Sequence, residues 1–296
     1  MKVIKANVLG FCMGVRRAVD LAINTANSSE VNSVFTLGSL IHNPKVLDDL
    51  KALGVNAITY GQLMTGKVIN KDSSVIIRAH GISPGLEMYL RSKVTNIIDA
   101  TCSKVKVNQL KTQELSQSGY SIFIAGETNE QGFKHAEIAG LLGYANTAPF
   151  HIVVSDVQEA QEAALSLYKS NKSAITALLG QTTISNEEYQ AIANEIKKYF
   201  PNLEIVNTIC AATNERQGAL REILTKVDAI IVAGGEESAN TRRLFAIAKE
   251  SGKPCVLVEN AKQIPKEFFS YDVIGISAGA STPDTIINEI EQALIK

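Results

Sequence analysis

The stretch 96-NIIDATCSKVKVNQLKTQELSQSGYSIFIAG-126 contains the pattern that decides the fold. A short apolar run (96–100) leads to Cys102, a helical segment (105–118) follows, and a second apolar run ends in Gly126. Such apolar runs are continuous rather than alternating, which is typical of strands buried on both faces of a parallel sheet. The stretch therefore predicts one strand–helix–strand unit of an α/β protein.

The same order of parts occurs around two other cysteines, Cys12 and Cys210. Each follows a strand-like run and precedes a helix and an apolar strand that ends in glycine, at a near-constant spacing from the cysteine. In each of the three units a polar residue then opens a further helix, and a later strand runs into a second polar position. The first set of polar residues is His42, His135 and Asn240, and the second set is His80, Thr182 and Ser281.

This repeat predicts three α/β modules with parallel sheets, related by a pseudo-threefold axis. We expect module 1 to span 1–101, with the N-terminal strand and Cys12, module 2 to span 102–209, and module 3 to span 210–296 with the C-terminal helix. Since strand carboxyl ends and helix N-termini share one edge of a parallel sheet, modules packed with these edges inward bring the three cysteines together.

Composition excludes several classes of protein. The 296 residues include 29 Lys+Arg and 30 Asp+Glu, a net charge of −1, which is too balanced for non-specific binding to nucleic acid. The 45% hydrophobic content is too high for a disordered chain, and no apolar run is long enough to span a membrane. Four cysteines are too few for a disulfide-rich secreted fold. We therefore expect a cytoplasmic protein. Because no extension follows the third module, we also expect no fused RNA-binding domain.

Three converging thiolates predict a soft metal site. They are one ligand short of the four cysteines that close a structural zinc site or a [4Fe–4S] cluster, so one iron of a cubane would stay open to a substrate oxygen. The imidazole, hydroxyl and amide groups of the two polar sets suit an anion such as phosphate, without the glycine-rich loops of nucleotide-binding proteins. Glu137, two residues after His135, is the best candidate proton donor.

Each marked residue also has a purely structural interpretation. A lone cysteine is often a small core hydrophobe, and we assign that role to Cys255, which lies in an apolar run outside the repeat. Four hydroxyl residues could be helix N-caps, namely Thr182, Thr183, Ser238 and Ser281. We interpret His151 as structural and the arginines Arg16 and Arg17 as part of a solvated face.

Nine segments in order along the whole chain resemble the 4-hydroxy-3-methylbut-2-enyl diphosphate reductase family of the methylerythritol phosphate route to isoprenoids. The segments are GFCMGVRRAV, IHNPKVL, RAHGIS, IDATCSKVKV, HAEIAGLLGY, GQTTIS, ICAATNERQ, GGEESANTRRL and SAGASTPD. The resemblance implies three modules around a central [4Fe–4S] cluster. It implies reduction of the allylic alcohol diphosphate to isopentenyl and dimethylallyl diphosphate, with loss of the hydroxyl as water and with electrons from a ferredoxin- or flavodoxin-type donor.

Residue roles follow from the same resemblance. The cluster ligands fall on Cys12, Cys102 and Cys210, and the catalytic positions on Glu137 as proton donor, Thr182 beside the substrate hydroxyl, and His135. The diphosphate-binding positions fall on His42, His80, His135, Ser238, Asn240 and Ser281. These neutral donors would hold the anion locally in a chain of net charge −1.

Three positions depart from the family pattern. Ala136 replaces a common proline, and Ser103 replaces the proline after the second cysteine. Ala239 replaces a serine between Ser238 and Asn240, so we expect rearranged phosphate contacts at that position. Glu127 and Glu130 are rival carboxylates to Glu137. A non-catalytic iron–sulfur redox sensor is the alternative function. A zinc-dependent phosphate-ester hydrolase is disfavoured because the chain has no H-E-x-x-H motif.

Overall fold

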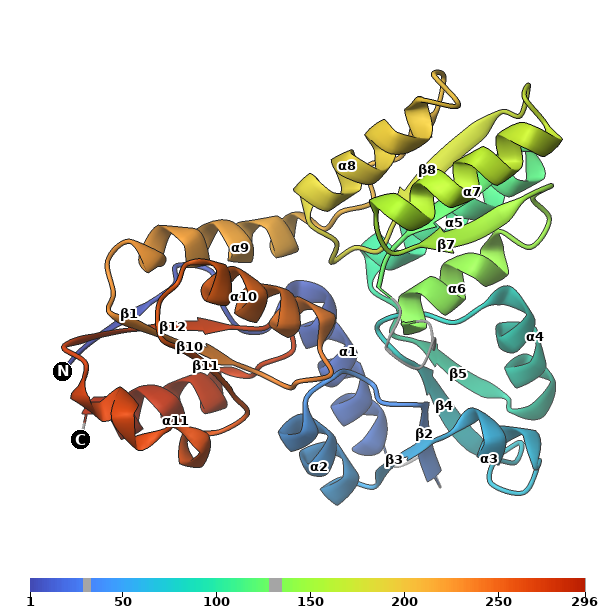
Figure 1. Cartoon of the computed structure of the whole chain (residues 1–296). Helices are drawn as coiled ribbons and strands as arrows, with labels where there is room; N and C mark the ends of the chain where they lie inside the picture. Colours follow the sequence, from blue (N-terminus) through green and yellow to red (C-terminus); the bar gives the residue numbers. More distant parts are fainter. Residues whose placement is uncertain (29–32, 128–134, 296) are drawn as a thin grey trace. The chain divides into compact units, whose positions relative to one another are not determined.

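Strands and helices alternate along the chain in the computed structural model, which describes residues 1–28, 33–127 and 135–295 (Figure 1). The strands are β1 (Lys2–Lys5), β2 (Ser33–Leu37), β3 (Val55–Ile58), β4 (Ser73–Ile77), β5 (Asn96–Asp99), β6 (Ser121–Ala125), β7 (His151–Val154), β8 (Thr176–Gly180), β9 (Glu204–Ile205), β10 (Ala229–Ala233), β11 (Cys255–Val258) and β12 (Val273–Ala278). The α-helices are α1 (Met13–Ala26), α2 (Pro44–Ala52), α3 (Tyr60–Met64), α4 (Pro84–Lys93), α5 (Ser103–Gln117), α6 (Ala136–Tyr144), α7 (Val157–Ser170), α8 (Asn186–Lys197), α9 (Ala211–Leu224), α10 (Ala239–Glu250) and α11 (Asp284–Ile295). Two short 3₁₀ turns, η1 (Ala261–Gln263) and η2 (Lys266–Ser270), separate β11 from β12.

The strands form three parallel four-stranded sheets, which confirms the predicted α/β class. One sheet has the order β1-β12-β10-β11, a second has the order β7-β6-β8-β9, and the third contains β2 to β5. The chain divides into two compact units, Met1–Ala57 with Ala211–Lys296 (unit 1) and Ile58–Cys210 (unit 2). The predicted module boundaries at 101/102 and 209/210 stay a prediction.

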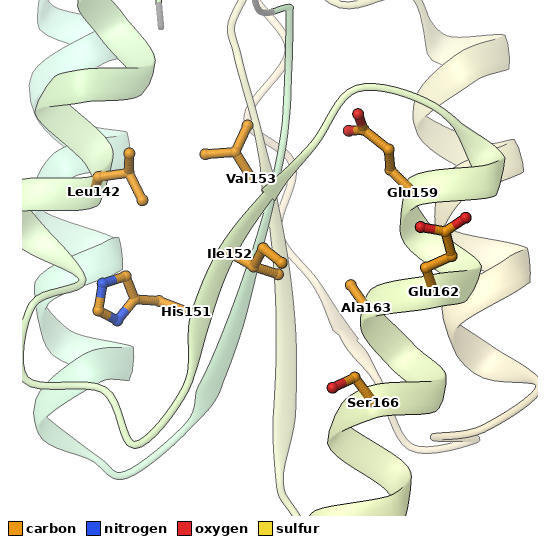
Figure 2. A pocket seen from close by; sticks show the side chains of 8 residues that line it. All are labelled: Leu142, His151, Ile152, Val153, Glu159, Glu162, Ala163 and Ser166. Carbon is orange, nitrogen blue, oxygen red and sulfur yellow. The ribbon is translucent and has the colours of Figure 1, made fainter. Parts of the chain in front are cut away.

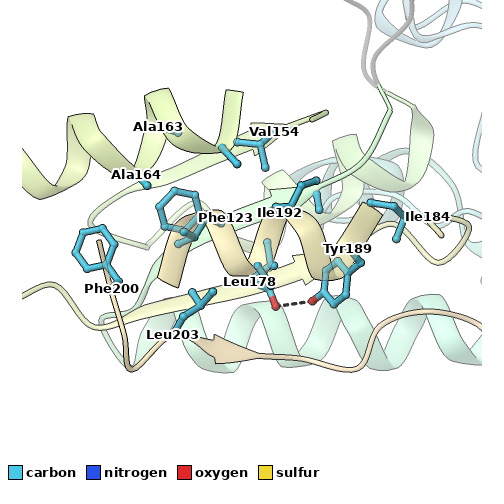
Figure 3. Close-up of a cluster of buried hydrophobic side chains, with 14 of the residues drawn as sticks. Phe123, Val154, Ala163, Ala164, Leu178, Ile184, Tyr189, Ile192, Phe200 and Leu203 are labelled. Carbon is cyan, nitrogen blue, oxygen red and sulfur yellow. Dashed lines mark hydrogen bonds between the residues drawn. The ribbon is translucent and has the colours of Figure 1, made fainter. Parts of the chain in front are cut away.

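Unit 2 has helices on both faces of the sheet β7-β6-β8-β9. Every residue of β6 and β8 is buried, as their continuous apolar sequences predict. Phe123 points into a cluster under α7 and α8 (Figure 3), while its neighbours along β6 pack with α5 and α6. Tyr189 of α8 lies in the first cluster and donates its hydroxyl to the carbonyl of Leu178 at 2.8 Å, which satisfies its buried polar atom.

Unit 1 contains the sheet β1-β12-β10-β11, with α11 on one face and α9 and α10 on the other. The N-terminal strand, which we expected in the first module, pairs in parallel with β12, with Lys2 opposite Val273. This pairing gives the buried strand β12 a hydrogen-bonded neighbour on each side, since β10 lies on its other side. In the described parts of the chain, no helix is both long and apolar enough to cross a membrane.

Candidate functional site

The three cysteines predicted as cluster ligands all lie at the N-termini of helices. Cys12 caps α1, where its Sγ accepts a hydrogen bond from the backbone N of Val15 at 3.5 Å. Cys102 is the N-cap residue of α5, and Cys210 directly precedes α9. All three are half-buried, and among the described residues none of them forms a disulfide. Helix N-termini stabilise negative charge, so these positions suit thiolates, the form in which cysteine binds metals.

In unit 2, a continuous series of contacts links Cys102 to the two histidines. The backbone N of Cys102 donates to the carbonyl of Ala79 at 2.9 Å, next to His80. The His80 ring meets the His135 ring edge-on, with 5.2 Å between ring centroids and an interplanar angle of 87°. Both imidazoles therefore lie at the carboxyl end of β4, where ligands bind in parallel α/β sheets.

His135 is held by the start of α6. It is the N-cap residue, and its Nδ1 accepts a hydrogen bond from the backbone N of Glu137 at 3.4 Å. Because Nδ1 acts as an acceptor, the neutral ring carries its proton on Nε2. His135 thus has an N–H group with which to donate to an oxygen of an anionic ligand.

Glu137 is the most deeply buried acidic side chain of the predicted site, with 1% exposure. Its Oε1 accepts from the backbone N of Thr182 at 2.8 Å, and its Oε2 accepts from the Thr182 hydroxyl at 2.9 Å. Burial raises the pKa of Glu137 to about 7, against the opposing effect of the two hydrogen bonds from Thr182. A carboxyl group with this pKa can deliver a proton at neutral pH.

The contacts continue from Thr182 to the third cysteine. The carbonyl of Thr182 accepts a hydrogen bond from the backbone N of Cys210 at 3.0 Å. Six predicted residues of unit 2 are therefore joined by contacts between neighbouring loops. They are Cys102, His80, His135, Glu137, Thr182 and Cys210.

Unit 1 gathers another part of the predicted site around the loop after β12. The backbone N of Cys12 donates to the carbonyl of Ala280 at 3.1 Å, and the neighbouring Ser281 donates its hydroxyl to the carbonyl of His42 at 3.0 Å. A Cβ atom on Gly235 would lie 2.8 Å from the same carbonyl, so this position accepts only glycine without a shift of the backbone.

The start of α10 presents polar groups whose hydrogen bonding is incomplete. Ser238 caps the helix by accepting from the backbone N of Thr241 at 3.3 Å, and its hydroxyl keeps a proton to donate. Asn240 is 4% exposed, and within the described ranges neither its Nδ2 nor its Oδ1 has a hydrogen-bond partner. A buried amide without partners costs free energy, so this arrangement favours a bound ligand that completes it.

The structure tests the N-cap and core roles that the sequence allowed for the marked residues. Ser238 is an N-cap, whereas Thr182 and Ser281 are not, because α8 is capped by Ser185 and the Ser281 hydroxyl bonds to a carbonyl. Cys255 lies in β11 and packs against a hydrophobic core cluster, as predicted, and burial raises the pKa of its thiol. Glu127 is half-buried, and Glu130 lies outside the described residues.

His151 is exposed at the start of β7 rather than buried in the core. It lines a groove of about 580 Å³ between α6 and α7, together with Glu159 and Glu162 (Figure 2). None of the predicted site residues lines this groove.

Sequence reasoning gave no role to two arginines of the matching motifs. Arg216 of α9 is 4% exposed, and its guanidinium donates to the carbonyl of Gly10 at 2.7 and 3.2 Å and to that of Ala212 at 2.7 Å. It thereby fixes the segment that leads to Cys12. Arg78 directly follows β4, two residues before His80. Their presence in ICAATNERQ and RAHGIS was the only signal in the sequence.

Comparisons with known proteins agree over the full length. The LytB protein family matches residues 3–295. The chain is 44% identical over 302 residues to the 4-hydroxy-3-methylbut-2-enyl diphosphate reductase of Treponema denticola, covering 100% of both chains. It is 37% identical over 294 residues to the enzyme of the same name from Aquifex aeolicus, covering 99% of this chain and 95% of the other.

Two solved structures also match. One, described as (E)-4-hydroxy-3-methyl-but-2-enyl diphosphate reductase, the terminal enzyme of the non-mevalonate pathway, is 36% identical, with a TM-score of 0.71 and coverage of 100% of this chain and 99% of that one. The E-1-hydroxy-2-methyl-but-2-enyl-4-diphosphate reductase from Plasmodium falciparum is 26% identical, with a TM-score of 0.87 and coverage of 100% and 88%. The full-length family match and these identities show that the chain belongs to the LytB protein family.

Proposed function

We propose that this protein is an iron–sulfur oxidoreductase that reduces 4-hydroxy-3-methylbut-2-enyl diphosphate to isopentenyl and dimethylallyl diphosphate. Full-length relatives that carry the name of this reductase support the proposal. The observation that carries it is the buried pair of Glu137 and Thr182, whose contacts lead to the loops of Cys102 and Cys210. A carboxyl group with a pKa near 7, linked through Thr182 to the backbone of Cys210, suits proton-coupled reduction.

Cys12, Cys102 and Cys210 would hold a [4Fe–4S] cluster. Their positions at three helix N-termini fit this ligand set, because each terminus favours the negative charge of a thiolate. When bound, a cluster with three cysteine ligands supplies electrons one at a time and a Lewis-acidic iron. Cys255 stays outside the ligand set, since it packs against the core.

The diphosphate would be bound by neutral hydrogen-bond donors. His135 offers Nε2–H, and Ser238 keeps a hydroxyl proton while its oxygen caps α10. Asn240 has a buried amide whose hydrogen bonds a phosphate oxygen would complete. His42, His80 and Ser281 are the other binding residues that we propose.

Glu137 would deliver the proton with which the substrate hydroxyl leaves as water. In its protonated form the carboxyl can donate to the Thr182 hydroxyl oxygen, and the Thr182 hydroxyl can donate onward. Thr182 would therefore orient the leaving group and pass the proton on. The overall reaction takes up two electrons and two protons, breaks the C4–O bond and releases one water.

Electrons must come from a separate carrier, for which we propose a ferredoxin- or flavodoxin-type protein. We place the reaction in the cytoplasm, since a reducing compartment keeps cysteine thiols out of disulfides.

An anaerobic assay tests this function against a redox sensor. The purified protein is mixed with the allylic diphosphate and a chemical reductant, and the two C5 diphosphate products are quantified. Reductase activity predicts product at multiple turnovers, with loss of product in Cys102→Ser and retention in Cys255→Ser. A reducible cluster that yields no product at any substrate concentration would contradict the proposal and favour the sensor.

A further inference from the structure

Arg78 is a charged side chain that the predicted site leaves unexplained. It directly follows β4 and is half-buried, and its Nε is closed off from solvent. Within the described residues, its guanidinium makes no ion pair, and its Nε has no hydrogen-bond acceptor. Burial lowers the pKa of this guanidinium, and no acidic neighbour opposes the effect.

The acid nearest to Arg78 in the strand register is already engaged. Ile77 at the end of β4 pairs with Asp99 at the end of β5. The Asp99 carboxylate accepts from the backbone N of Thr101 at 2.9 Å and lies 3.3 Å from the Nζ of Lys106. Its charge is therefore balanced without the guanidinium.

A tight turn fixes the backbone of Arg78 two residues before His80. The backbone N of Gly81 donates to the carbonyl of Arg78 at 2.9 Å, which closes a turn with His80 at its third position. Gly81 has a φ of +70°, a conformation that favours glycine, and an added Cβ would lie 2.3 Å from Nε2 of Gln109. The guanidinium thus belongs to the same rigid segment as the imidazole that meets His135.

A partly buried guanidinium without a counter-charge is costly, and an anion can remove that cost. Guanidinium binds phosphate oxygens with two parallel N–H groups and is more weakly hydrated than an ammonium group. Within the described residues Arg78 makes no ion pair with a carboxylate, and His80, two residues further along the same turn, meets the ring of His135. These properties favour a phosphate-type anion over water as the missing partner.

We propose that Arg78 is an additional anion-binding residue, which contacts the diphosphate group of the ligand together with His80 and His135. The identity of the ligand rests on the proposed function, whereas the need for an anion rests on the guanidinium itself. The permanent positive charge of Arg78 would then supplement the neutral donors that the sequence led us to expect.

Calorimetry with inorganic diphosphate tests the proposal on the holoprotein. The variants are Arg78→Gln, which removes the charge, and Arg78→Lys, which keeps it without the planar fork. The matched control is Arg91→Gln, since Arg91 is exposed on α4 and pairs with Glu87 at 2.6 Å. We expect the dissociation constant to rise about 10- to 100-fold in Arg78→Gln, less in Arg78→Lys, and not in the control.

Thermal unfolding of the ligand-free protein separates binding from a structural role. Removal of a buried charge that lacks a partner should leave the melting temperature of Arg78→Gln equal to or above that of the wild type. Saturating diphosphate should raise the melting temperature of the wild type more than that of the variant. A lower melting temperature without ligand would indicate a structural role and overturn the proposal.

Two outcomes distinguish this proposal from the proposed function. Normal reductase turnover together with unchanged diphosphate affinity and KM in Arg78→Gln would overturn the role of Arg78 alone. Weakened diphosphate binding in that variant, in a protein that never reduces the allylic substrate, would support the anion site and refute the reductase. A wild-type protein that does not bind inorganic diphosphate at all would also overturn the Arg78 site.

Discussion

Both carboxylate oxygens of Glu137 accept hydrogen bonds from Thr182, one from the backbone N at 2.8 Å and one from the side-chain hydroxyl at 2.9 Å. Two donors from one residue fix the orientation of a carboxyl group that is almost completely buried. They only partly offset the effect of burial, because the pKa of Glu137 is still raised to about 7. Glu137 therefore exchanges a proton in the neutral range, next to a hydroxyl that can relay it.

Glu137→Gln should bind substrate and turn over very slowly. Glutamine keeps the size and the acceptor for the backbone N of Thr182 but has no acidic proton, so we expect kcat to fall about 100-fold or more. The wild-type rate should decline as pH rises above 7, because the acid form is lost. Steady-state kinetics across this range, with a chemical reductant, provide the test. Near-normal turnover in the variant would assign the proton to another group.

Glu137 should also make stability depend on pH. Its folded pKa of about 7 exceeds the ordinary value of 4.5 for a glutamate, so the unfolded state ionises first as pH rises. The contribution of Glu137 to stability is fully present below pH 4.5 and is lost as pH rises through 7, by on the order of 3 kcal/mol. Above pH 7, Glu137→Gln should therefore unfold at a higher denaturant concentration than the wild type, and the difference should disappear in acid. A constant difference at all pH values would contradict the raised pKa.

Asn240→Ala should weaken diphosphate binding with little effect on the fold. The buried amide makes no hydrogen bond within the described residues, so its removal costs the ligand-free protein little. The dissociation constant for inorganic diphosphate should rise about 10-fold, as expected for a lost hydrogen bond to a charged ligand. Calorimetry measures this, with Asn56→Ala as an exposed control. Equal affinities in Asn240→Ala and the wild type would remove Asn240 from the binding site.

Arg216→Met should loosen the segment that leads to Cys12. Loss of the guanidinium leaves the carbonyl of Gly10 without two of its donors, and we expect the free energy of unfolding to fall by about 1–3 kcal/mol. Iron bound per chain after anaerobic purification should fall as well, with partial recovery in Arg216→Lys. Arg221→Met, on the exposed side of the same helix, is the control. A full complement of iron in a destabilised Arg216→Met protein would limit the residue to a structural role.

Continuous apolar runs were sufficient to predict the buried parallel strands, because burial on both faces removes the need for polar residues. β6 and β8 are the clearest cases. The partner of β1 was not predictable, since pairing with β12 joins residues from opposite ends of the chain. No local pattern specifies such a pairing.

The candidate site was predictable where local geometry decides it. The position of each cysteine before a helix follows from the strand–helix order, and Ser238 is the N-cap that its residue type favours. Thr182 and Ser281 have the same residue chemistry, yet they bond to distant groups, the Glu137 carboxylate and the His42 carbonyl. Sequence alone does not reveal which polar atoms lose their partners on burial, and so the properties of Arg78 and Asn240 become visible only in the structure.

The central claim is that Cys12, Cys102 and Cys210 hold one cluster at which the diphosphate substrate reacts. Mössbauer spectroscopy of the anaerobically purified, iron-57-labelled protein, with and without the substrate, tests it most directly. We predict a [4Fe–4S] spectrum with one distinct iron whose parameters change when substrate is added, with the same result in Cys255→Ser. A protein that binds zinc without iron, or a cluster whose spectrum is indifferent to the diphosphate substrate, would contradict it.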